Sequence, residues 1–169
     1  MANIGLFYGS STGNTELIAQ RVKELLYPLI VELFDVAECI PEKILNFNRL
    51  ILGISTWGNG DLQDDWTNFL GKIKNYNFSE KKIAIFGLGD QDAYAETFVD
   101  AMGVLFNFMK ERKAKIIGRW PLDGYNFISS KAVIGGFFVG LPLDEDSQGD
   151  LTLERLKRWT DIVKKDFFN

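Results

Sequence analysis

Hydrophobic residues alternate along the chain between two spacings. Short, continuous apolar runs predict β-strands at residues 4–8, 30–34, 50–54 and 83–87, and a fifth strand begins at 116–117 and is completed at 137–141. The first, third and fourth runs are almost wholly apolar. This is typical of central parallel strands that are covered on both faces.

Between these runs, apolar residues at helical spacing predict amphipathic helices whose apolar faces pack in the core. The three faces are formed by Leu17, Ile18, Val22, Leu25, Leu26 and Leu29; by Phe98, Met102, Leu105, Phe106 and Met109; and by Leu153, Leu156, Trp159, Ile162 and Val163. The alternation predicts one α/β domain over residues 1–169, with a doubly wound, five-stranded parallel sheet in the order 2-1-3-4-5.

The segment 119–136 does not follow this alternation. It contains Pro121, the pair Asp123-Gly124 and the pair Ser129-Ser130, all of which favour turns. We therefore predict a loop insertion that splits the fifth strand.

The composition excludes several common kinds of catalytic and metal site. Histidine is absent and Cys39 is the single cysteine among 169 residues, so no imidazole base, Cys-His dyad or cysteine zinc site is expected. The net charge of −4 argues against binding to nucleic acid. No apolar run approaches the ~18 residues of a membrane span, and the first residues lack the features of a signal peptide. With a lone thiol, these features predict a cytoplasmic, reducing location and neither a catalytic residue nor a metal site.

The loop after the first strand is rich in hydroxyl groups and runs into a helix. It comprises Ser10, Ser11, Thr12, Gly13, Asn14 and Thr15, and no Lys or Arg occurs between residues 9 and 20. Free N–H groups at a helix N-terminus bind anions. Asn14 stands where a P-loop would need Lys, which favours a monophosphate ester over a triphosphate. Helix capping alone is the alternative for these residues.

Aromatic residues occur in two Gly-rich loops after the third and fourth strands. Trp57 lies in the first loop and Tyr94 in the second, and neither loop has the spacing of a dinucleotide-binding motif. Ordinary packing would explain either residue alone. Two aromatic rings at the ligand-binding edge, next to an anion site, favour a pocket that holds a flat ring system between them.

These segments together resemble the flavodoxin family. The similarity is carried by the loops at 10–15, 56–58 and 87–95, and residues 138–146 with the split fifth strand resemble the long-chain branch. It extends over residues 4–159. The resemblance implies a low-potential electron carrier, not an enzyme, that holds FMN noncovalently. The flavin would cycle between quinone, neutral semiquinone and hydroquinone states and donate electrons to redox enzymes.

The resemblance also implies roles for individual residues. The expected FMN-binding residues are Ser10, Ser11, Thr12, Gly13, Asn14 and Thr15 for the phosphate; Trp57 and Tyr94 for the ring faces; the main chain of Thr56, Gly58, Asn59, Gly60, Leu88, Gly89 and Asp90 for the ring edge; and Asp146 for the ribityl chain. Thr97, Val99 and Ser147 depart from common choices in the family, so we assign no flavin contact to them.

Acidic residues are concentrated in the loops that would surround the flavin. They are Asp61, Asp64, Asp65, Asp90, Asp92 and Asp146. Surrounding negative charge disfavours an anionic reduced flavin, so we expect a low potential for the second reduction step. Glycine tolerates positive φ, so the peptide between Gly58 and Asn59 could flip. Such a flip would change the gap between the potentials of the first and second one-electron reductions of the flavin.

The same acidic runs predict attraction to a basic redox partner, with a merely solvated acidic face as the alternative. The resemblance implies ferredoxin- or flavodoxin-NADP reductase donors, varied acceptors and a monomeric carrier. One rival is an NAD(P)H:quinone or flavin reductase on the same fold. The sequence has no basic cluster that would bind the 2′-phosphate of NADPH. The second rival is a phospho-receiver domain, which needs an acidic pair after the first strand and an Asp after the third. In this chain Gly9-Ser10 and Thr56-Trp57 occupy these places.

Overall fold

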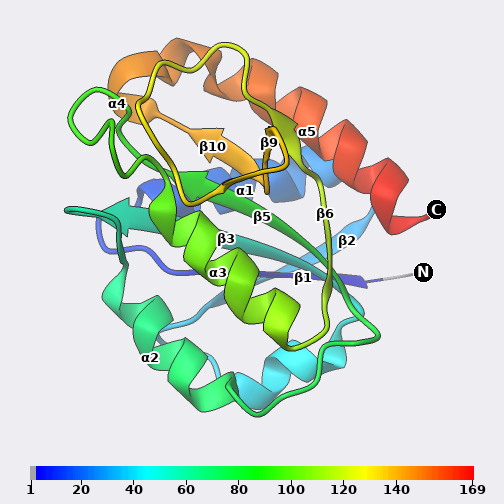
Figure 1. Cartoon of the computed structure of the whole chain (residues 1–169). Helices are drawn as coiled ribbons and strands as arrows, with labels where there is room; N and C mark the ends of the chain where they lie inside the picture. The colour runs from blue at the N-terminus through cyan, green and yellow to red at the C-terminus, as the bar shows by residue number, and fades with distance from the viewer. Residues whose placement is uncertain (1–2) are drawn as a thin grey trace.

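The computed structural model describes residues 3–169, and its centre is a parallel sheet between two layers of helices (Figure 1). The strands of the sheets are β1 (Asn3–Tyr8), β2 (Ile30–Asp35), β3 (Arg49–Trp57), β4 (Asp61–Leu62), β5 (Lys82–Leu88), β6 (Lys115–Ile117), β7 (Trp120–Pro121), β8 (Val133–Ile134), β9 (Phe137–Phe138) and β10 (Leu141–Leu143). The helices are α1 (Asn14–Leu26), α2 (Asp64–Ile73), α3 (Asp100–Glu111), α4 (Glu145–Gln148) and α5 (Thr152–Phe167), with 3-10 turns η1 (Pro41–Asn46) and η2 (Gly149–Leu151).

The order of the main strands confirms the predicted doubly wound topology. The path β10-β5-β3-β1-β2 is parallel throughout, and it corresponds to the order 2-1-3-4-5 when β10 is counted as the fifth strand. The almost wholly apolar strands β1, β3 and β5 occupy the interior of the sheet, as their patterns predict. Helices α1 and α5 cover one face, and α2 and α3 cover the other (Figure 1).

The fifth strand is split, as predicted, but its second half differs from the expected one. β6 pairs with residues 82–84 of β5, and β10 pairs with residues 86–88. Phe137 and Phe138, expected in this strand, instead form β9 in a separate small sheet with β7 and β8. The Phe138 ring packs within an aromatic cluster against Phe98, Tyr125 and Phe127, and this packing draws the segment out of the main sheet.

Two further expectations need correction, and two elements were not predicted. The insertion 119–136 is not simply a loop, because it contributes β7 and β8 to the small sheet. Leu17 and Leu153, assigned to apolar faces, are 60% and 45% exposed, since each lies at the border of its helix stripe. Helix α2 and turn η1 were not expected, although α2 buries Trp66, Phe69, Leu70 and Ile73 on one face.

In the part of the chain that is described, no helix is both long enough and apolar enough to cross a membrane.

Candidate functional site

A cleft of about 280 Å³ opens beyond the carboxyl ends of β1, β3 and β5. Figure 1 shows the turn between β3 and β4, the loop after β5 and helix α4 together at the left edge of the molecule. The lining residues are Thr12, Asn14, Ser55, Thr56, Trp57, Gly58, Leu88, Gly89, Asp90, Tyr94, Glu145 and Asp146. In an open parallel sheet, this switch point is where ligands bind.

The first loop brings the start of α1 to the cleft. Gly13 precedes the helix with φ of 91°, a left-handed conformation that suits glycine, and its N–H donates to Ser10 Oγ at 3.0 Å. No side chain among residues 3–169 caps α1, so the N–H groups of its first turn are available to an anion. Thr12 and Asn14 line the cleft at this end.

Some hydroxyl groups of the first loop are engaged elsewhere. Thr15 is buried and its Oγ1 lies 2.9 Å from Ser55 Oγ, while Ser11 Oγ accepts from Gln63 Nε2 at 3.0 Å. Ser10, Ser11, Gly13 and Thr15 flank the lining residues Thr12 and Asn14 in sequence but do not line the cleft themselves. Their assignment as phosphate ligands stays a prediction, and Thr15 fits it least because its side chain is already paired.

The second loop presents an indole ring. Trp57 is the last residue of β3 and pairs with Asp61 across a tight turn, and 40% of its surface is exposed. The preceding residue, Thr56, is fixed by helix α3, because its Oγ1 accepts a hydrogen bond from the N–H of Ala101 at 3.1 Å. Gly58 lines the cleft, whereas Asn59 lies in a neighbouring hollow and Gly60 packs close to the buried Asp100.

The third loop presents the phenol ring of Tyr94, which is 43% exposed. Asp90 Oδ1 accepts from the N–H groups of Asp92 at 3.0 Å and Ala93 at 2.9 Å, and the N–H of Tyr94 donates to the carbonyl of Asp90 at 3.0 Å. These bonds fold the loop into a turn that carries the ring to the cleft. Gly89 is tied to β10 by its N–H, which donates to the carbonyl of Leu143 at 3.0 Å.

The fourth segment is the start of α4, where Glu145 and Asp146 line the cleft. The preceding Asp144 is fully buried and caps this helix by accepting from the N–H of Ser147 at 2.9 Å. With Asp90, the described lining residues include three carboxylates and neither Lys nor Arg. The cleft is therefore anionic at its rim.

Two residues that line the cleft, Ser55 and Glu145, were not predicted from the sequence. Each is the immediate neighbour of a predicted residue, so extending the predicted segments by one position would have found them. Thr97, Val99 and Ser147, to which no contact was assigned, do not line it. Ser147 donates instead from its hydroxyl to Asp92 Oδ2 at 2.9 Å, which links α4 to the third loop.

The fold and the cleft place the chain among doubly wound α/β proteins with a ligand site at the topological switch point. Residues 6–159 match the family model described as Flavodoxin. Flavodoxins of Helicobacter pylori and a Picosynechococcus strain are 44% and 46% identical over 167 and 168 residues, covering 99% of this chain and 99% of each relative. The chain belongs to the flavodoxin family.

A solved structure is similar over the same length. Fusobacterium nucleatum flavodoxin bound to flavin mononucleotide has a TM-score of 0.94 and 32% sequence identity, covering 98% of this chain and 99% of that one. The predicted resemblance to the flavodoxin family and the predicted doubly wound fold are thus confirmed.

Proposed function

We propose that this protein binds FMN noncovalently in the cleft and carries single electrons between redox proteins. The observation that carries the proposal is the pair of half-exposed rings, Trp57 and Tyr94, on one cleft with the uncapped start of α1. Aromatic side chains left half in water are suited to cover the two faces of a planar ring. The bound flavin supplies the redox chemistry.

The start of α1 fits the phosphate of FMN. Free N–H groups, the positive end of the helix dipole and the hydroxyl groups of Ser10, Ser11 and Thr12 offer neutral donors without a cation. The Thr15 hydroxyl, already paired with Ser55, fits this role least. Gly13 favours this role because space around its Cα is open, with no atom within 4 Å of where a Cβ would stand. An anion can therefore approach the backbone closely.

The remaining segments fit the rest of the cofactor. The main chain at Thr56–Gly60 and Leu88–Asp90 is proposed to meet the edge of the ring, and Asp146 the ribityl chain. Glu145 lies beside Asp146 on the lining and joins it in this role. No side chain of the cleft is proposed as a catalytic acid, base or nucleophile.

The charge of the cleft supports a low potential for the second reduction step. Asp90, Glu145 and Asp146 line it without a neutralising cation among the described lining residues. Adding negative charge to a ring held there is electrostatically unfavourable. A redox titration of the holoprotein is expected to give a second midpoint below that of free FMN, and a value above it would contradict this part of the proposal.

The same charges favour a basic partner. We propose that one copy of the chain, acting as a single domain in the cytoplasm, docks donors and acceptors over the exposed edge of the ring. Electrostatic steering makes the association rate fall with ionic strength. Transfer from the photoreduced holoprotein to cytochrome c, a basic haem protein, is expected to slow as salt is added. A rate independent of salt would argue against steering.

Titration of the apoprotein with FMN tests the central proposal. Flavin fluorescence is expected to be quenched to a stoichiometry of one. Trp57→Ala and Tyr94→Ala should each weaken binding by roughly tenfold, because an aromatic stacking contact contributes ~0.5–1.5 kcal/mol beyond its buried area. Tyr27→Ala is the matched control, since Tyr27 is 80% exposed and lies outside the cleft.

Two outcomes would overturn the proposal. An apoprotein that takes up no FMN would remove its basis. Steady oxidation of NADH or NADPH by the purified holoprotein alone would instead favour the flavin reductase alternative.

A further inference from the structure

A second hollow, which we name the edge groove, lies at the open edge of the sheet where the fifth strand is interrupted. β6 ends at Ile117 opposite Ala84, and the chain returns to the sheet only at Leu141, opposite Phe86. The groove has a volume of about 420 Å³, within the range of small-molecule pockets. It lies beside β6, which pairs with residues 82–84 of β5, whereas the cleft lined by Trp57 and Tyr94 (the flavin cleft) lies beyond the carboxyl end of β5. The two sites share no lining residue.

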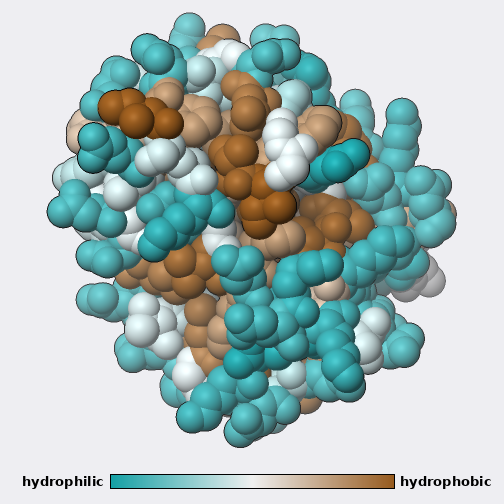
Figure 2. All heavy atoms as spheres, viewed as in Figure 1, coloured by the Kyte–Doolittle hydropathy of each residue, from teal (hydrophilic) through white to brown (hydrophobic). Residues whose placement is uncertain are grey.

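Part of the lining of the edge groove is apolar. Its apolar lining residues include the buried Ile117 and Val139, together with Phe106 of α3 and Ile134 of the insertion. Ile134 is 47% exposed, so apolar surface faces water here. Figure 2 shows hydrophobic residues gathered across this face of the molecule, over the insertion and beside β6. Covering such surface is favourable at roughly 25 cal/mol per Å².

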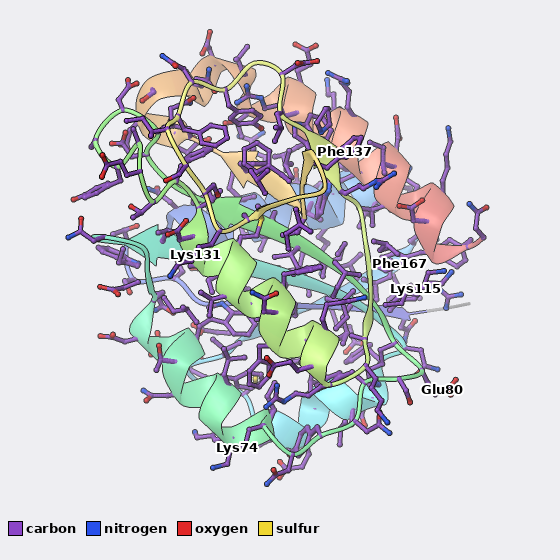
Figure 3. The ribbon with its side chains drawn as sticks, viewed as in Figure 1. Lys74, Glu80, Lys115, Lys131, Phe137 and Phe167 are labelled. Carbon is purple, nitrogen blue, oxygen red and sulfur yellow. The ribbon has the colours of Figure 1, made fainter. Side chains whose placement is uncertain are left out.

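The rim of the edge groove carries three cations, Lys110, Lys115 and Arg119. Among residues 3–169, none of the three forms an ion pair. The guanidinium of Arg119 lies 4.3 Å from the centre of the Phe137 ring, which positions it beside the groove. Figure 3 labels Lys115 and Phe137, which lie toward opposite ends of the β6 segment.

The acidic residue of the edge groove does not neutralise this rim. Asp166 is the one carboxylate side chain among the described lining residues, and its Oδ2 accepts from the N–H of Gly118 at 3.2 Å. The concentration of cations is notable because the whole chain has a net charge of −4. A hollow that combines apolar side chains with three cations outside any ion pair is complementary to a molecule with an apolar body and one anionic end.

We propose that the edge groove binds a small amphipathic carboxylate with an aliphatic or aromatic body. The body would cover Phe106 and Ile134, and the carboxylate would meet Arg119 and Lys115. Arginine is suited to this role because its guanidinium donates two parallel hydrogen bonds to a carboxylate. The inference does not depend on FMN, since no residue of the flavin cleft takes part.

Titration of the isotope-labelled holoprotein with decanoate tests the inference by NMR. Saturable shifts are expected in the amide signals of residues 106, 110, 115–119, 134 and 139. Decanol, which has the same body without the charge, should bind at least tenfold more weakly. Absence of saturable binding, equal binding of decanol, or shifts confined to the flavin cleft would each overturn the proposal.

Variants separate the contributions of charge and apolar surface. The double variant Lys115→Glu/Arg119→Glu should weaken decanoate binding at least tenfold, and Ile134→Ser should weaken it several-fold. The matched controls are Lys74→Glu and Ile128→Ser, which alter exposed residues outside the groove and should leave binding unchanged. The flavin absorption spectrum reports that each variant is folded. Decanoate binding that survives in the double variant would refute the site.

Discussion

The carboxylate of Asp144 accepts two hydrogen bonds from Gln91, one from its backbone N–H at 3.0 Å and one from its side-chain amide at 2.8 Å. Both residues are buried, and Asp144 also accepts from the N–H of Ser147 at 2.9 Å. This carboxylate therefore joins the loop that carries Tyr94 to the helix that carries Asp146. Gln91 extends the network to the insertion, because its Oε1 accepts from the N–H of Asn126 at 2.6 Å.

Replacing Asp144 with Asn is expected to loosen these two segments together. The amide turns one acceptor into a donor that faces N–H groups, and a buried unsatisfied group costs ~1–3 kcal/mol. We expect a comparable fall in the free energy of unfolding, measured in urea, and roughly tenfold weaker FMN binding. Asp123→Asn is the control, because Asp123 is exposed and does not line the cleft. Native FMN affinity in Asp144→Asn would show that the carboxylate does not position the cleft.

The central sheet could be predicted because its signal is local. Strands β1, β3 and β5 are buried on both faces, and an apolar run of that kind is visible within one short window of sequence. Which sheet Phe137 and Phe138 join could not be predicted in this way. Their backbone pairs with Trp120–Pro121 and Val133–Ile134, and Phe138 packs on Phe98, so distant partners decide between two sheets.

In the candidate site, too, some residues could be predicted from local sequence and others could not. Trp57 and Tyr94 follow strand ends, and parallel topology alone brings the ends of strands to one edge. The supporting polar residues carry no such signal. Gln91 and Asp144 are 53 positions apart in sequence, and Thr15 and Ser55 are 40 apart, so each pair is recognisable only once the chain has folded.

Gly58→Ala is expected to narrow the gap between the two one-electron potentials. Gly58 has φ of 51°, and positive φ at this position of the turn suits glycine best. Because the nearest atom to an added Cβ is 3.8 Å away, the substitution changes backbone preference without a clash. A penalty of ~1 kcal/mol on the form of the turn that has positive φ at Gly58 corresponds to roughly 40 mV in the potential of each one-electron reduction. Spectroscopic redox titration measures the gap.

The control for Gly58→Ala is Gly135→Ala in the insertion. Gly135 has φ of 63° and open space around its Cα, so the backbone cost is similar while the flavin cleft is untouched. The potentials of this control should equal those of the native protein. A gap that stays unchanged in Gly58→Ala as well would refute the turn hypothesis.

Gly103→Ala is expected to detach the insertion from helix α3. A Cβ at Gly103 would overlap the backbone carbonyl of Lys131, whose N–H donates to Asp100 Oδ1 at 2.7 Å. Figure 3 shows the labelled Lys131 beside the start of α3. Because the atoms that the added Cβ meets are main chain and cannot rotate away, we expect a loss of ~2 kcal/mol or more in the free energy of unfolding, and faster proteolytic cleavage within residues 119–136.

The matched control for this prediction is Gly71→Ala in α2. Gly71 is also helical, but nothing lies within 4 Å of where its Cβ would stand. That substitution should raise stability by up to ~1 kcal/mol, because alanine is the better helix former. Equal effects of the two substitutions would mean that the insertion does not rest on Gly103.

Tyr8→Phe is expected to flatten the loss of stability at alkaline pH. Burial, together with the nearby carboxylates of Glu16 and Asp35, raises the pKa of Tyr8 from 10.0 to about 12, and its phenol donates to Glu16 Oε1 at 3.2 Å. Between these pH values the folded chain keeps a proton that the unfolded chain has released. The free energy of unfolding of the native protein therefore falls as pH rises through this window, whereas the variant lacks this contribution.

Urea unfolding of native protein and Tyr8→Phe at intervals from pH 8 to 12 measures the difference. Below pH 10 the two curves should run parallel, and above it the native curve should fall more steeply. Burial lowers the pKa of Lys81, but that contribution is common to both proteins and cancels in the comparison. Glu16→Gln should give an intermediate slope, because it removes one of the anions that disfavour the phenolate. Parallel curves throughout would show that the Tyr8 phenol titrates alike in the folded and unfolded chains.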